Sequence, residues 1–139
     1  MEKIHIKNQD EMADFARQIA GLAKVGDIIT LKGTLGAGKS FFAENFINFL
    51  SEKKVNVLSP TFNLVYNYDS KKGEIFHFDL YRLKNAQDLE NIGFFDAIRN
   101  GICLIEWPEI AADFLQKNYL EIEIKILEGE GREILLNRR

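Results

Sequence analysis

Cysteine and long apolar runs are scarce in this chain of 139 residues. Its one cysteine, Cys103, cannot form a disulfide within the chain. The thiol lies in the apolar run 102–105, which favours a buried core position over a nucleophile. No stretch approaches the roughly 18 consecutive apolar residues that cross a membrane, and no signal peptide opens the chain. We therefore expect a cytoplasmic protein with no membrane partner.

Positive charge is not in excess either. The 18 Lys and Arg residues are outnumbered by 21 Asp and Glu, which gives a net charge of −3 and a pI of about 5.5. This balance argues against a protein whose main task is to hold nucleic acid electrostatically, although it allows a place beside a partner that does. No repeat, low-complexity segment or linker divides the sequence. Residues 1–139 are therefore expected to form one domain.

The most informative segment present is residues 33–40, Gly-Thr-Leu-Gly-Ala-Gly-Lys-Ser, which matches the P-loop pattern G-x-x-x-x-G-K-[ST]. Its glycines let backbone N–H groups turn toward phosphate oxygens, and the next helix adds a partial positive charge. Lys39 supplies charge for the β- and γ-phosphates, and the Ser40 hydroxyl is placed to hold Mg²⁺. The expected nucleotide-binding residues here are Gly33, Thr34, Leu35, Gly36, Ala37, Gly38, Lys39, Ser40 and Phe41.

The segments on either side of this motif provide the context that it requires. Residues 27–32 form a β-branched apolar run bounded by glycines, which indicates a buried strand. A helix up to Ser51 is predicted next, because residues recur at helical spacing. The alternative, a glycine-rich turn without a ligand, does not explain this strand–loop–helix order. The recurring positions are Phe41, Phe42, Asn45, Phe46, Phe49 and Leu50.

The remaining patterns predict an α/β fold, a P-loop NTPase-like mixed β-sheet flanked by helices. A helix capped by Asn8 or Asp10 is expected to run to about Leu22. Its inner stripe would be Met12, Phe15, Ala16, Ile19 and Leu22. Strands are expected at 1–7, 55–58, 64–68, 74–79, 101–107, 119–127 and 132–136, and helical pieces at 85–99 and after Pro108.

Two acidic residues end apolar strands and are candidate site residues. Asp79 comes at the carboxyl end of a predicted strand, where ligands gather in α/β sheets, and suits the acidic partner of a P-loop metal. Glu106 comes at the end of the apolar strand predicted at 101–107 and could hold Mg²⁺ or position water at the same sheet edge. The alternatives are purely structural roles: a turn or helix-cap residue for Asp79 and a salt-bridged strand end for Glu106. Trp107 is either a core anchor or a flat surface near a base.

Four motifs, taken in order and spacing, resemble the bacterial TsaE (YjeE) family, the ATPase component of tRNA threonylcarbamoyladenosine synthesis. They are Gly33–Ser40, Ser59-Pro60-Thr61-Phe62, His77-x-Asp79-x-Tyr81-Arg82 and Glu106-Trp107-Pro108-Glu109. The likeness covers nearly the whole chain. Two positions depart from the family pattern: Ser40 stands where Thr is frequent, and Thr34 where an acidic residue is frequent.

The resemblance implies ATP and Mg²⁺ as cofactors and an ATPase that is slow without its partners. It implies catalytic roles for Glu106, Asp79 and Lys39, and metal binding by Ser40, Glu106 and Asp79. Thr61 would bind near the γ-phosphate, in a switch-like loop. The implied partners are TsaB- and TsaD-type proteins of the threonylcarbamoyl transferase complex, which the ATPase would reset between turnovers, with tRNA contacted only indirectly.

Other nucleotide-binding classes give weaker matches. A small-molecule kinase would need a substrate lid carrying arginines, and residues 85–99 offer only Arg99. A GTPase needs an Asn-Lys-x-Asp guanine reader, and residues 85–88 lack the lysine. A non-enzymatic adaptor that binds ATP as a folding ligand would keep its function without Glu106.

Overall fold

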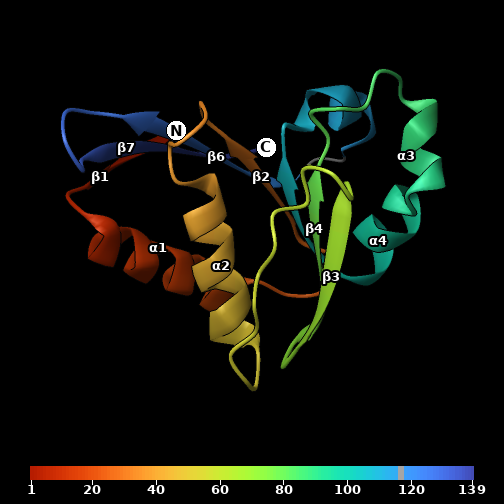
Figure 1. Ribbon diagram of the computed structural model, residues 1–139, viewed down its shortest axis with the longest axis horizontal. Coiled ribbons are helices and arrows are strands. Elements are labelled where there is room, and N and C mark those ends of the chain that lie inside the picture. The colour runs from red at the N-terminus through yellow and green to blue at the C-terminus, as the bar shows by residue number, and fades with distance from the viewer. Residues whose placement is uncertain (116–117) are drawn as a thin grey trace.

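The expected mixed β-sheet forms the centre of the computed structural model, which describes residues 1–115 and 118–139 (Figure 1). In that part of the chain, seven strands pair in the order β1-β7-β6-β2-β5-β4-β3. The α/β fold class predicted from the sequence is confirmed. The strands are β1 (Glu2–Ile6), β2 (Ile28–Lys32), β3 (Val65–Ser70), β4 (Gly73–Asp79), β5 (Ile102–Glu106), β6 (Leu120–Ile126) and β7 (Arg132–Arg138).

Strand direction brings the candidate site together at one sheet edge. β4, β5, β2 and β6 run parallel to one another, whereas β3, β7 and β1 pair antiparallel to their neighbours. The carboxyl ends of β2, β4 and β5 therefore meet, and this is the edge at which open α/β sheets bind ligands. Register places Asp79 of β4 directly beside Glu106 of β5.

Helices cover both faces of the sheet (Figure 1). On one face lie α1 (Gln9–Leu22), whose Asn8 side chain accepts a hydrogen bond from the Glu11 amide as the N-cap, and α2 (Lys39–Leu50). On the other lie α3 (Gln87–Asn91), α4 (Phe94–Asn100) and the 3₁₀ helix η1 (Pro108–Phe114). Among the described residues, no helix is long and apolar enough to cross a membrane.

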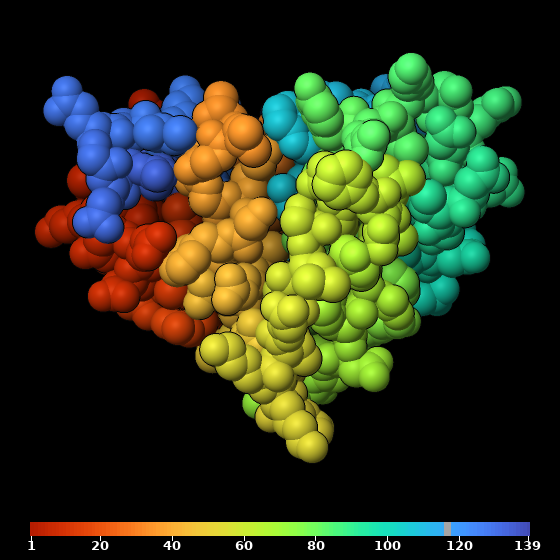
Figure 2. Space-filling model, in the orientation of Figure 1, coloured from red at the N-terminus to blue at the C-terminus, as the bar shows by residue number. Residues whose placement is uncertain are grey.

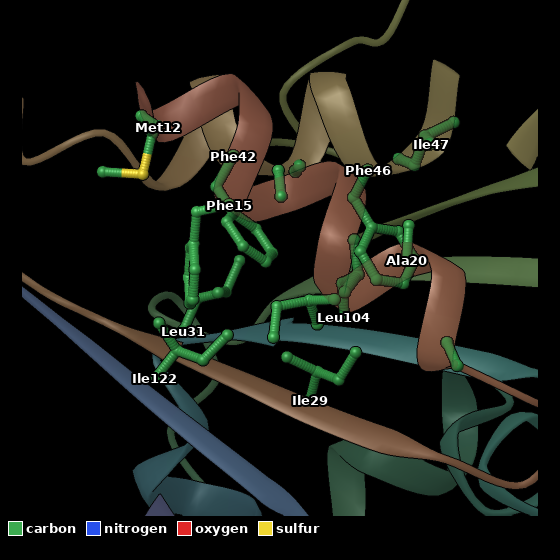
Figure 3. Close-up of a cluster of buried hydrophobic side chains, with 14 of the residues drawn as sticks. Met12, Phe15, Ala20, Ile29, Leu31, Phe42, Phe46, Ile47, Leu104 and Ile122 are labelled. Carbon is green, nitrogen blue, oxygen red and sulfur yellow. The ribbon is translucent and has the colours of Figure 1, made fainter. Parts of the chain in front are cut away.

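Each face has its own buried hydrophobic cluster. Between the α1–α2 pair and the sheet, aromatic side chains of both helices meet aliphatic side chains of the strands, as labelled in Figure 3. On the opposite face, Phe78 and Phe94 pack edge to face with centroids 5.2 Å apart, beside Cys103. Cys103 is fully buried, as predicted for a core thiol, and burial raises its pKa to about 12.

Two local predictions were wrong. Residues 55–58 form no strand, because their backbone bonds to side chains instead of a neighbouring strand: the Val55 amide donates to Asn48 Oδ1, and the Leu58 amide to Tyr68 Oη. Leu22 is 74% exposed, since the buried stripe of α1 continues through Ala20 and Ala23. The helix predicted up to Ser51 is present as α2, and among its recurring positions Phe49 is 46% exposed, because the inner face carries Phe42, Ala43, Phe46, Ile47 and Leu50.

Candidate functional site

The P-loop is a tight connection between β2 and α2 that only glycine can build at its two ends. A Cβ on Gly33 would stand 2.8 Å from the carbonyl oxygen of Ile124 in β6. Gly38, the last residue before α2, has φ 118°, in the left-handed region that favours glycine. The first N–H groups of α2, from Lys39 onward, precede the helix's own hydrogen bonds and are available to an anion.

Lys39 points into the site although its side chain is almost fully buried. Its Nζ donates to the Gly33 carbonyl at 2.7 Å and lies 4.1 Å from the centroid of the Trp107 ring. Trp107 has φ 54°, a left-handed conformation that costs a bulky residue about 1–3 kcal/mol. Its ring packs against Tyr81 at 4.8 Å and lines the site, so Trp107 provides a flat surface there and not a core anchor.

The Asp79 carboxylate is buried and both of its oxygens accept hydrogen bonds. The Tyr81 amide donates to Oδ1 at 3.0 Å, and the Thr61 hydroxyl donates to Oδ2 at 3.1 Å. Because Thr61 has a single hydroxyl proton, Ser59 donates to Thr61 at 2.8 Å. This chain of contacts ties the Ser59–Thr61 loop to the end of β4. Asp79 therefore acts as a turn residue, through the Tyr81 amide, and also holds the Ser59–Thr61 loop, through Thr61.

Glu106 is also buried, and its carboxylate bonds to a different side chain. Its Oε2 lies 2.6 Å from Nε2 of His77, a fully buried residue of β4. Asp79 and Glu106 are direct register neighbours with like charges, but each is held by its own donors. The alternative for Glu106 was a salt-bridged strand end. The structure shows a related arrangement, in which Glu106 at the cavity wall is hydrogen-bonded to His77.

These groups surround one cavity of about 710 Å³. Residues 34–41, Thr61, Asp79 and Glu106 all line it, whereas Gly33 does not, although its carbonyl accepts a hydrogen bond from Lys39. Segment 33–50, orange in Figure 2, lies between the blue C-terminal strands and the yellow-green segment that contains the Ser59–Thr61 loop. The structure thus brings the predicted site residues together from four separate parts of the chain.

Sequence reasoning missed the residues that complete the cavity from the two ends of the chain. Gln9 and Met12 reach it from α1, and Glu130 and Arg132 from the β6–β7 turn and the start of β7. The Arg132 guanidinium Nε donates to the Ala37 carbonyl at 3.0 Å and so braces the P-loop. No local signal marks these positions, because only the tertiary fold brings them to the P-loop.

Comparison with known proteins decides the family. The model of the family described as "Threonylcarbamoyl adenosine biosynthesis protein TsaE" matches residues 6–134. The chain belongs to the TsaE family. The resemblance carried by the four motifs is thereby confirmed.

Relatives and one solved structure extend this match over most of the chain. A protein from Rickettsia prowazekii named "tRNA threonylcarbamoyladenosine biosynthesis protein TsaE" is 37% identical over 91% of this chain and 88% of its own length. A protein of that name from Aquifex aeolicus is 33% identical over 100% and 98%. The crystal structure of YdiB from Bacillus subtilis has a TM-score of 0.73 at 31% identity, covering 96% of this chain and 82% of that one.

The donor set of this TsaE-family cavity is compatible with magnesium. Ser40, Asp79 and Glu106 offer one hydroxyl and two carboxylates, and hard oxygen donors are the ligands that Mg²⁺ takes. Within residues 1–115 and 118–139, no group of three or more His, Cys, Asp or Glu side chains forms a ready-made metal cage. That fits Mg²⁺, which is usually bound through one or two carboxylates together with substrate phosphates.

Proposed function

We propose that this chain binds Mg·ATP in the cavity, hydrolyses it slowly, and serves the formation of threonylcarbamoyladenosine in tRNA together with TsaB- and TsaD-type proteins. One observation carries the proposal: a complete P-loop shares its cavity with two buried carboxylates at the ends of adjacent strands. Membership of the TsaE family and the names of its relatives support the link to tRNA modification.

The residues divide between binding and chemistry. The N–H groups at the start of α2 and the Lys39 ammonium bind phosphate oxygens, with Lys39 exchanging the neutral Gly33 carbonyl for an anionic acceptor. Ser40, Asp79 and Glu106 would hold Mg²⁺, which when bound offsets the negative charge of the phosphates. Glu106 also orients the attacking water, because its carboxylate lines the cavity and is fixed on one side by His77.

The loop next to Asp79 is where a partner protein would sense the bound nucleotide. Thr61 joins Asp79 to the Ser59–Thr61 loop, and the adjoining Phe62 is 80% exposed, beneath the Arg82 guanidinium at 5.0 Å from the ring centroid. A change in what Asp79 binds would move this exposed aromatic residue. The Arg99 side chain, the only arginine of 85–99, pairs with Asp96 on the surface and does not line the cavity, so no kinase-like lid is supported.

Calorimetric titration with Mg·ATP tests the binding half of the proposal. We expect Mg·ATP to bind more tightly than Mg·GTP, because the guanine-reading motif is missing. Lys39→Ala should weaken ATP binding by about tenfold or more, since a charge-assisted contact is lost. Lys54→Ala, an exposed lysine outside the cavity, is the matched control and should bind normally. An unchanged affinity of Lys39→Ala for Mg·ATP would refute the assignment of this cavity as the nucleotide site.

Turnover assays test the chemical half. Asp79→Asn and Glu106→Gln should each lower ATP turnover about 10- to 100-fold while changing ATP affinity much less, because positioning of metal and water acts mainly in the transition state. Glu109→Gln changes an exposed carboxylate three residues after Glu106 and should retain activity. Equal losses of binding and turnover, or phosphate transfer to an added acceptor in place of water, would contradict the assignment.

A further inference from the structure

We propose that His77 is a positioning residue that donates its Nε2–H to Glu106 and holds this carboxylate turned into the nucleotide cavity. The proposal rests on the function proposed above, and it assigns a task to a buried side chain that is not itself a proposed ligand of phosphate or metal. His77 does not line the cavity itself, so it acts through Glu106 and not on the nucleotide.

Strand register explains why Glu106 needs such a partner. Its direct neighbour on β4 is Asp79, whereas His77 is paired with Leu104, two residues back along β5. The Glu106 side chain nevertheless reaches diagonally to His77, with Oε2 2.6 Å from Nε2. Like charges directly opposite one another on neighbouring strands are destabilising, and a hydrogen bond donated to a carboxylate stabilises its charged form. Of the side chains in the described part of the chain, His77 alone hydrogen-bonds that carboxylate.

The surroundings of the imidazole ring specify where its proton lies. His77 is 1% exposed, and within residues 1–115 and 118–139 no hydrogen-bond partner reaches Nδ1. A proton on Nδ1 would be a buried donor without an acceptor, and it would leave two acceptors facing each other at Nε2 and Oε2. The tautomer with its proton on Nε2 donates to the Glu106 carboxylate and leaves only Nδ1, an unprotonated acceptor, without a partner in the described part of the chain. The pair therefore has a fixed direction of donation.

One oxygen of Glu106 is thereby occupied, and the other remains for the cavity. A ligand held by a donor behind it keeps one orientation, and loss of such supporting partners typically costs about 10- to 100-fold in metal affinity or activity. The opposite neighbour, Asp79, is held in the same manner by Thr61 and the Tyr81 amide. Each carboxylate thus has its own separate support, and His77 is the one that serves Glu106.

Two substitutions of equal polarity separate positioning from simple core stability. In His77→Gln, the side-chain amide nitrogen falls near the place of Nε2 and can donate to Glu106. In His77→Asn, the amide falls near the place of Nδ1 and cannot reach it. We expect His77→Asn to lower ATP turnover about 10- to 100-fold with ATP affinity within about threefold, and His77→Gln to recover most of the loss. Urea unfolding shows whether the two variants are equally stable.

Two further readouts do not need ATP hydrolysis. Nitrogen-15 NMR of the imidazoles should show the Nε2–H form for His77, lost in Glu106→Ala; the exposed His5, the only other histidine, is the internal control. The Mg²⁺ dependence of ATP binding should weaken in His77→Asn and be restored in His77→Gln. A proton on Nδ1, equal losses in both variants, or no loss in His77→Asn overturns the proposal. A wild-type chain that binds Mg·ATP without hydrolysing it overturns the ATPase assignment instead, and then NMR and Mg²⁺ dependence decide on His77.

Discussion

Single buried polar groups determine what this site can do, and their partners come from distant parts of the sequence. Asp79 is held by Thr61, 18 residues earlier, and Glu106 by His77, 29 residues earlier. The sequence places both carboxylates at strand ends, and so predicts the edge at which they meet. Their hydrogen-bond partners depend on loop closure and strand register, which no local pattern specifies. Chemistry is therefore easier to predict here than the side chains that orient it.

Cys103 gives a residue-scale prediction on pH. Burial raises its thiol pKa from 9.0 to about 12, so between these values the unfolded chain has lost a proton that the folded chain keeps. The free energy of unfolding must fall as pH rises through this window, by up to about 1.4 kcal/mol per pH unit from this group. We expect the stability deficit of Cys103→Ala to shrink between about pH 8 and about pH 10 in urea unfolding. A deficit that stays constant would contradict a buried neutral thiol.

At the scale of elements, sequence patterns predict what is fixed by neighbours along the chain. The β2–P-loop–α2 unit is predicted well because glycine positions and apolar periodicity act over a few residues. Residues 55–58 show the limit: Val55 and Val57 are half-buried against the core, so their alternation reports burial correctly. Whether a buried segment pairs as a strand depends on what its N–H groups meet, and here these are Asn48 and Tyr68 side chains.

Lys72 gives an element-scale prediction. Helix α1 has no basic residue in its last turn, and Lys72 from the β3–β4 turn supplies the charge instead. Its Nζ donates to the carbonyls of Gly21 and Ala23, each at 2.7 Å. A cation at a partly buried helix end contributes about 1–2 kcal/mol, so Lys72→Met should lower the free energy of unfolding by that amount. Lys71→Met, its exposed neighbour, should change it by less than about 0.5 kcal/mol. Equal losses of unfolding free energy in the two variants, measured by urea unfolding, would show that Lys72 does not stabilise the end of α1.

At the scale of the whole molecule, both ends of the chain close on the P-loop. Residues of α1 form one side of the cavity, and Arg132 of β7 supports the loop through the Ala37 carbonyl. The middle of the chain supplies Thr61, Asp79 and Glu106. The proposed nucleotide binding would therefore involve both ends of the chain and its middle, and its effects would reach the exposed Phe62 through the Thr61–Asp79 contact.

The cellular role is the prediction that belongs to this scale. Segments near both ends of the chain complete the cavity, and within residues 1–115 and 118–139 no second substrate lid covers it. We therefore expect the ATP cycle to be read by a partner protein at the Ser59–Thr61 loop and Phe62. The net charge of −3 favours docking on proteins over direct contact with tRNA. Depletion should therefore lower threonylcarbamoyladenosine in cellular tRNA, measured by mass spectrometry of nucleosides. Wild-type protein should restore it, and Glu106→Gln should not, although it still captures the TsaB- and TsaD-type partners. Normal threonylcarbamoyladenosine levels in depleted cells would contradict the proposed function and make a small-molecule kinase the favoured alternative.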